Sequence, residues 1–137
     1  MEEIEQIEPI TEQQQAEVIN ATDRCIALAS KRYGRDFAPV PVNFDLRGKC
    51  AGMYQVSRKH RRIRYNPWLF AKYYQDSLSD TVIHEVAHYI VDCLYGFQRV
   101  KPHGPEWKSI MVDLGGIYRY IIGISAMNRY IGDHLRT

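Results

Sequence analysis

Residues 84–107 read HEVAHYIVDCLYGFQRVKPHGPEW, and the prediction of the fold starts from this stretch. Two histidines stand four positions apart with a glutamate directly after the first, and a third histidine follows fifteen positions after the second. Residues four apart on an α-helix lie on one face, one turn from each other. If the segment is helical, His84 and His88 therefore point the same way.

Helix-forming patterns surround the two histidines. Ser77 and Asp80 stand in capping-box spacing before an apolar run, which predicts a helix that begins at Ser77 and ends at Gly96. Its apolar stripe contains Val82, Val86, Tyr89, Ile90 and Cys93. Gly104-Pro105-Glu106 predicts the start of another helix, which Gly115-Gly116 would end. The apolar face of that helix contains Trp107, Ile110, Met111 and Leu114.

A long helix is expected near the start of the chain. Thr11 and Gln14 fit a capping box, and a helical period continues until Gly34, which predicts a helix over residues 11–33. Its buried side is expected to contain Ala16, Ile19, Thr22, Cys25, Ile26, Leu28 and Ala29.

The middle of the chain predicts a small sheet. Apolar residues alternate over 40–46, which indicates a half-buried strand, and a second strand is expected over 51–57. The basic segment 58–62 is interpreted as a polar turn, and 63–65 as the strand that completes a hairpin. A short helix over 68–73 and a helical tail over 117–137 complete an α+β fold with a three-stranded sheet.

Composition fits one soluble domain. The 137 residues are 45% hydrophobic and 25% charged, values typical of a globular chain. Residues 1–10 form an acidic lead, and 11–137 are expected to form a single domain. The sequence contains neither a signal-peptide pattern nor an apolar run of membrane-spanning length, which favours a cytoplasmic protein, nucleoid-associated if it binds DNA. The three cysteines, Cys25, Cys50 and Cys93, show no Cys-x-x-Cys spacing and are interpreted as idle or buried thiols.

The spacing of the histidines points to a metal. Two imidazoles one helical turn apart can bind one zinc ion, and Glu85, about 100° around the helix from His84, can reach a water on that ion. This is the arrangement of HExxH hydrolases, in which the carboxylate is the general base. A catalytic zinc needs a third protein ligand. Asp92 lies one further turn along the helix, too far to join the other two, and is expected to be an outer partner or solvated.

His103 is the predicted third ligand. Gly96 permits the chain to reverse, and the seven steps from Gly96 to His103 can span up to about 24 Å, enough to return to the metal. Gly104 permits close backbone approach. Val91 and Leu94 stand where the metzincin pattern requires glycine and histidine, so that class is excluded. His60 and His134 are interpreted as surface residues.

The charge is unevenly distributed. Residues 1–22 contain six glutamates and no basic residue, which leaves 18 basic and 10 acidic residues in the remainder. A basic cluster in the hairpin region is a candidate nucleic-acid contact and contains Lys49, Arg58, Lys59, Arg61, Arg62 and Arg64. The alternative is a solvated turn that protects a sheet edge. Tyr54 and Trp68 could stack on bases, although core packing is the commoner fate of such aromatics.

These residues resemble the SprT-like family, which includes bacterial SprT proteins and eukaryotic Spartan proteases. The resemblance is carried by His84-Glu85-Val86-Ala87-His88 and by His103-Gly104-Pro105-Glu106-Trp107-Lys108, with a softer match at residues 48–52 and 63–67. It implies a zincin-like metalloprotease with one Zn²⁺ on His84, His88 and His103, and Glu85 as base. It also implies protein substrates that are associated with DNA or crosslinked to it. Residues 116–137 contain no cysteine, so the family's zinc ribbon is absent from them.

The sequence is compatible with two other functions. The first is a catalytically quiet, zinc-stabilised domain that binds DNA or acts as an adaptor. The second is a metal-free helical protein. Glu85 disfavours the first alternative, because a structural zinc site has no use for a base and usually has four protein ligands.

Overall fold

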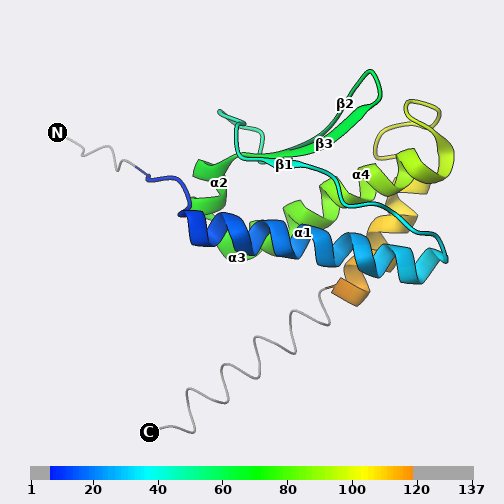
Figure 1. Ribbon diagram of the computed structural model, residues 1–137, viewed down its shortest axis with the longest axis horizontal. Helices are drawn as coiled ribbons and strands as arrows, with labels where there is room; N and C mark the ends of the chain where they lie inside the picture. The colour runs from blue at the N-terminus through cyan, green and yellow to red at the C-terminus, as the bar shows by residue number, and fades with distance from the viewer. Residues whose placement is uncertain (1–6, 119–137) are drawn as a thin grey trace, which may run out of the picture.

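The first helix of the protein lies alongside the helix that contains the histidine pair (Figure 1). The structure is a computed structural model that describes residues 7–118. Helix α1 spans Glu12–Tyr33 and begins with the predicted capping box, in which Thr11 and Gln14 exchange side-chain-to-backbone hydrogen bonds. Gly34 ends it in the left-handed conformation, with φ of 65°. The predicted bounds of this helix are confirmed.

The buried face of α1 differs from the prediction at its start. Ala16 and Ile19 are exposed, and Val18 is fully buried instead. Val18 lies four positions before Thr22 and therefore on the face that continues into the core. The other buried residues of α1 are Thr22, Cys25, Ile26 and Ala29. Leu28 is half-buried against this core.

The sheet has three strands in the order β1-β3-β2. Strands β2 (Gly52–Ser57) and β3 (His60–Tyr65) form the predicted antiparallel hairpin, and β1 (Val42–Asn43) pairs in parallel with β3. The prediction of a strand over 40–46 was wrong in length, because only two of these residues pair with β3. The turn that was predicted over 58–62 covers only Arg58 and Lys59 in the structure, and Arg58 has a φ of 59°.

The Asn66 side chain caps the start of α2 (Pro67–Lys72), and a continuous helical segment follows this helix. It consists of α3 (Tyr74–Asp76), the π-helical turn η1 (Ser77–Thr81) and α4 (Val82–Tyr95). The prediction that a helix starts at Ser77 was wrong. The Ser77 backbone is itself helical, and its N–H donates to the Tyr73 carbonyl at 2.8 Å, so the residue continues a helix rather than capping one.

The last helical segment described covers residues 105–118 and begins at Pro105 as predicted. It does not end at Gly115-Gly116. Leu114 and Tyr118 are fully buried, and the Tyr118 hydroxyl donates to the Leu78 carbonyl at 3.1 Å. This packing compensates for the low helix propensity of the two glycines. The tail helix predicted over 117–137 falls, apart from its first two residues, outside the part of the chain that the structure describes.

Helix α4 lies at the centre of the domain. It packs against α1 on one side and β2 on another. Its fully buried residues are Val82, Ile83, Val86, Ala87 and Ile90. His84 and His88 are left on the half-buried face, toward the loop that follows α4. Within residues 7–118 no helix is both long and apolar enough to cross a membrane.

Candidate metal centre

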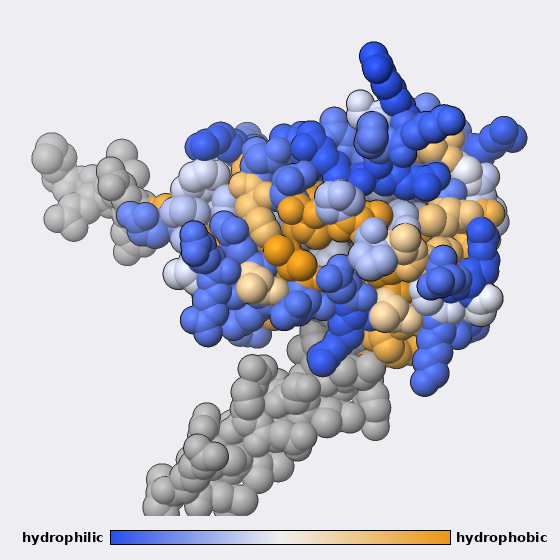
Figure 2. All heavy atoms as spheres, in the orientation of Figure 1, coloured by the Kyte–Doolittle hydropathy of each residue, from blue (hydrophilic) through white to orange (hydrophobic). Residues whose placement is uncertain are grey.

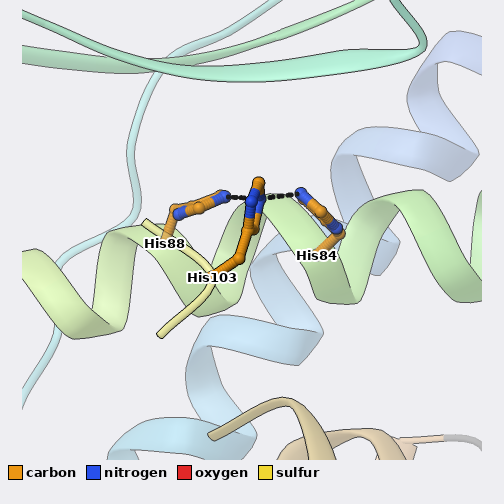
Figure 3. Close-up of side chains that lie close together, drawn as sticks. All are labelled: His84, His88 and His103. Atoms are coloured by element: carbon orange, nitrogen blue, oxygen red, sulfur yellow. Dashed lines mark hydrogen bonds between the residues drawn. The ribbon is translucent and has the colours of Figure 1, made fainter. Parts of the chain in front are cut away.

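Three histidine rings converge above α4 (Figure 3). His84 and His88 extend from α4, and His103 reaches between them from the loop before the last helix. The Nε2 atom of His103 lies 3.1 Å from Nε2 of His88 and 3.1 Å from Nε2 of His84. The structure therefore brings together the three histidines that the sequence predicts as ligands.

The chain returns through a loop with unusual backbone angles. Gly96 ends α4 with a φ of 97°, and Gln98 and His103 have φ of 61° and 60°. The turn at His103 is closed by the Gly104 N–H, which donates to the Lys101 carbonyl at 3.0 Å. A left-handed backbone at a residue other than glycine costs about 1–2 kcal/mol and is concentrated at functional sites. The backbone at His103 is thus strained where its ring joins the cluster.

The distances among the ring nitrogens fit a shared cation. A neutral imidazole Nε2 either donates or accepts a hydrogen bond, so His103 cannot satisfy both neighbours through one nitrogen. Tetrahedral zinc bonds of about 2.0–2.1 Å place two nitrogen ligands about 3.3–3.4 Å apart. The observed 3.1 Å separations lie close to this value. The chemistry and spacing of the donors therefore fit zinc.

The surroundings keep the α4 histidines neutral. Burial lowers the pKa of His84, and burial together with the neighbouring imidazoles lowers the pKa of His88 to about 4. Neutral imidazole is the form that binds metals. Trp107 packs against all three rings, with its ring centroid 4.6 Å from that of His103, and its indole N–H donates to the His84 carbonyl at 3.3 Å. The sequence places Trp107 on the apolar face of its own helix and does not predict its contact with the three rings.

Glu85 lies beside the cluster and inside the protein. Its side chain is buried, and its Oε2 atom is 3.9 Å from Nε2 of His84. Burial raises the pKa of this carboxyl to about 7, although the backbone N–H of Tyr54 partly offsets the effect. A carboxyl with a pKa near neutrality can both accept and release a proton.

Gly52 lets β2 approach Glu85. A Cβ atom at this position would lie 2.9 Å from Cγ of Glu85 and 2.9 Å from Cγ2 of Thr81. The sequence indicates Gly52 only as a break in the chain, because nothing local shows that a helix lies against it.

We expect Gly52→Ala to destabilise the metal-free protein by about 1–3 kcal/mol, because the methyl group overlaps Glu85 and Thr81 and pushes β2 away from α4. Denaturant unfolding followed by circular dichroism measures this loss. Gly116→Ala is the matched control, since a Cβ there meets nothing within 4 Å and alanine favours the helix. Equal stability of Gly52→Ala and wild type would contradict the close packing of β2 on Glu85.

The cluster opens into a cleft of about 410 Å³ between β2 and the loop after α4. His84, Glu85, His88 and His103 lie on its floor and wall. The apolar part of the lining contains Met53, Val91, Phe97, Val100, Pro102 and Trp107. Cys50 is also at this cleft, exposed, and its thiol donates to the Gly52 carbonyl. The cleft leads from solvent to the three histidines and to Glu85.

The basic cluster of the hairpin is only partly free. Arg61 pairs with the buried carboxylate of Asp92 at 2.8 Å, and Arg64 pairs with Asp45 at 2.8 Å. Arg62 bonds to Gln55 and Asn43 and lies 3.7 Å from Asp45. Lys49, Arg58 and Lys59 are exposed, without an ion-pair partner among residues 7–118. Hydrophilic side chains cover the hairpin side of the molecule, and apolar ones gather below it (Figure 2).

Asp92, Tyr54 and Trp68 have structural partners. The alternative of a solvated Asp92 was wrong, because its carboxylate is buried between Arg61 and the Tyr54 hydroxyl. Tyr54 packs on Tyr89, with ring centroids 5.8 Å apart. Trp68 is half-buried under the Arg47 guanidinium, 4.4 Å from its ring centroid. His60 is exposed on β3, and His134 lies outside the described residues.

Comparison with known proteins places the chain in a family. The model of the SprT-like family matches residues 22–126, and this chain belongs to that family. Its curated relatives include Protein SprT of Vibrio parahaemolyticus, 43% identical over 94 residues, which cover 68% of this chain and 54% of that protein. Protein SprT of Pseudomonas fluorescens is 42% identical over 64% of this chain and 51% of the relative.

A third relative, Protein SprT of Pseudomonas aeruginosa, is 35% identical over 84% of this chain and 72% of its own length. The chain spans about half the length of the first two relatives. No solved structure matches the chain.

Proposed function

We propose that this protein is a zinc-dependent metalloprotease with a zincin-like fold. The observation that supports this most is the convergence of three histidine Nε2 atoms beside a buried carboxylate, inside an open cleft. Membership of the SprT-like family agrees with it. His84, His88 and His103 would hold one zinc ion, and Glu85 would be the general base.

The proposed role of each residue follows from the position of its side chain. The three imidazoles would hold a zinc ion, which would serve as a Lewis acid and lower the pKa of a water molecule toward neutrality. Glu85, buried beside the cluster, would take a proton from the attacking water and deliver it to the leaving amine. Trp107 packs on the three rings and fixes their orientation. The apolar wall of the cleft excludes bulk water and takes up substrate side chains.

Peptide hydrolysis is expected to require metal. Purified protein loaded with one zinc ion should cleave an unfolded protein such as labelled casein, lose this activity on treatment with a chelator, and regain it with added zinc. The measurement is fragment release on gels and by mass spectrometry. Cleavage that persists at full rate after metal analysis shows less than about 5% residual zinc would contradict the proposal.

A protein bound or crosslinked to DNA is the proposed natural substrate. Three exposed cations of the hairpin, Lys49, Arg58 and Lys59, are available for phosphate contacts, whereas the other three basic residues of the cluster already face carboxylate or amide oxygens. Contacts of this kind are independent of sequence and weaken with salt. Stimulation of cleavage by DNA that disappears at high salt is the result that supports this substrate.

A further inference from the structure

Asp92 is a buried carboxylate on α4, one turn beyond His88, and the mechanism above gives it no role. Its Oδ2 atom accepts a hydrogen bond from the Tyr54 hydroxyl at 2.5 Å and another from Arg61 Nε at 2.8 Å. Both donors belong to the β2–β3 hairpin. The Asp92 side chain is 3% exposed and that of Arg61 is 46% exposed, so the hairpin closes over the carboxylate.

Tyr54 contacts two carboxylates of α4 at once. Its hydroxyl donates to Asp92, and its backbone N–H lies close enough to Glu85 to lower the pKa of that carboxyl. Glu85 and Asp92 are seven positions apart, which places them two turns apart on the same face of the helix. One residue of β2 therefore spans the part of α4 that contains the proposed base.

The register of the hairpin leaves the Tyr54 N–H without a hydrogen-bond partner in β3. Asn66 N–H donates to the Ala51 carbonyl at 2.9 Å, which makes residues 51 and 66 a hydrogen-bonded pair. Bonded and non-bonded pairs alternate along an antiparallel ladder, so Tyr54 opposite Ile63 is non-bonded and turns its backbone groups away from β3. Gly52 lies on the same outer edge and contacts Glu85. The edge of β2 that faces away from β3 thus packs on α4 at Glu85.

We propose that Tyr54, Asp92 and Arg61 form a latch that fixes the register of β2 on α4 and so holds the Glu85 carboxylate in the orientation that proton transfer needs. All three are positioning residues. The kinetic consequence of the latch rests on the proposed function, whereas the contact of β2 with α4 does not.

Tyr54→Phe tests the latch because it removes only the hydroxyl and keeps the ring that packs on Tyr89. We expect kcat for peptide hydrolysis to fall about tenfold, because small misplacement of a base weakens proton transfer. KM and zinc affinity should stay within about twofold, since the substitution keeps the ring that lines the cleft and changes no proposed metal ligand. In a Tyr54→Phe, Asp92→Asn double variant, the combined loss should be smaller than the product of the two single losses.

Tyr74→Phe is the matched control. Its hydroxyl also bonds to a carboxylate at 2.5 Å, that of Glu17 on α1, away from the cleft. Each variant loses one tyrosine-to-carboxylate hydrogen bond, and the bond of Tyr74 is the more exposed of the two, so Tyr74→Phe controls for the loss of such a bond away from the cleft. Only Tyr54→Phe should lower kcat.

A second measurement is independent of activity. Amide hydrogen exchange at residue 54, followed by NMR, should be about tenfold faster in Tyr54→Phe than in wild type and unchanged in Tyr74→Phe. Unchanged exchange at residue 54 overturns the latch, as does an unchanged kcat in an active enzyme. If the wild type has no peptidase activity while exchange changes as expected, the proposed function fails and the latch stands as a structural contact.

Discussion

Glu85→Gln is expected to remove nearly all of the proposed peptide hydrolysis while zinc binding is retained. The amide has nearly the size of the carboxylate and fills the same buried place against Gly52, but it cannot accept a proton. General-base catalysis contributes about 10²–10⁴-fold, so kcat/KM should fall by about a thousandfold. Steady-state cleavage of a fluorogenic peptide, with zinc content determined on the same samples, measures both quantities.

Glu106→Gln is the matched control for this substitution. Glu106 is a neighbouring glutamate in the first turn of the last helix and does not line the cleft, so its loss should leave kcat/KM unchanged. Cleavage by Glu85→Gln at the wild-type rate would show that another group is the base. Loss of zinc from Glu85→Gln would show instead that Glu85 helps to hold the metal.

The same variant has an expected effect on stability. Burial raises the pKa of Glu85 in the folded protein from 4.5 to about 7. The ionised carboxylate therefore disfavours folding, and this penalty develops as pH rises from about 4.5 to about 7 and is complete above that range. Metal-free Glu85→Gln should consequently be more stable than metal-free wild type at pH 8, on the order of 2 kcal/mol, and equally stable at pH 4. Denaturant unfolding at the two pH values measures the difference.

Removal of the His103 ring is expected to weaken zinc binding by about 10²–10³-fold, because the site loses one of three proposed ligands. At free zinc about a thousandfold above the wild-type Kd, zinc should stabilise the wild type by about 4 kcal/mol and the variant by about 1 kcal/mol. Competitive titration with a zinc indicator gives the affinity, and thermal unfolding with and without zinc gives the stabilisation.

The choice of substituent matters at position 103. The backbone there is left-handed, with φ of 60°, which asparagine tolerates better than alanine does. His103→Asn therefore tests the ligand, and His103→Ala adds the backbone cost. His60→Ala is the control histidine, because it is exposed on β3 and distant in sequence from the cluster. Zinc affinity of His103→Asn equal to wild type would exclude His103 as a ligand.

The sequence predicts well those features that a few neighbouring residues decide. The capping box at Thr11 and the left-handed Gly34 depend on local backbone chemistry, and both bounds of α1 follow from them. The approach of His103 to the other two histidines was also predictable, because it depends only on helix geometry, chain reach and one glycine. These features depend on local backbone chemistry and on one short path of the chain, and not on packing between distant elements.

Features that depend on packing between distant segments were not predictable. Ser77 has the pattern of a helix cap, yet the structure continues the helix through a π-helical turn. Gly115-Gly116 has the pattern of a stop, yet the buried Tyr118 beyond it anchors the helix through Leu78. The contact of Gly52 with Glu85 joins a strand to a helix more than 30 residues away, and no local pattern indicates it.

The supports of the three histidines differ in stiffness. His84 and His88 stand on α4, the most enclosed helix of the domain, whereas His103 is exposed on a loop with left-handed residues at 98 and 103. A bound metal ion would therefore tie the loop to the helix through His103, since its other two proposed ligands stand on α4. For a metal ion bound by the cluster, we expect the rate of release to depend on the loop over 97–104 more than on α4.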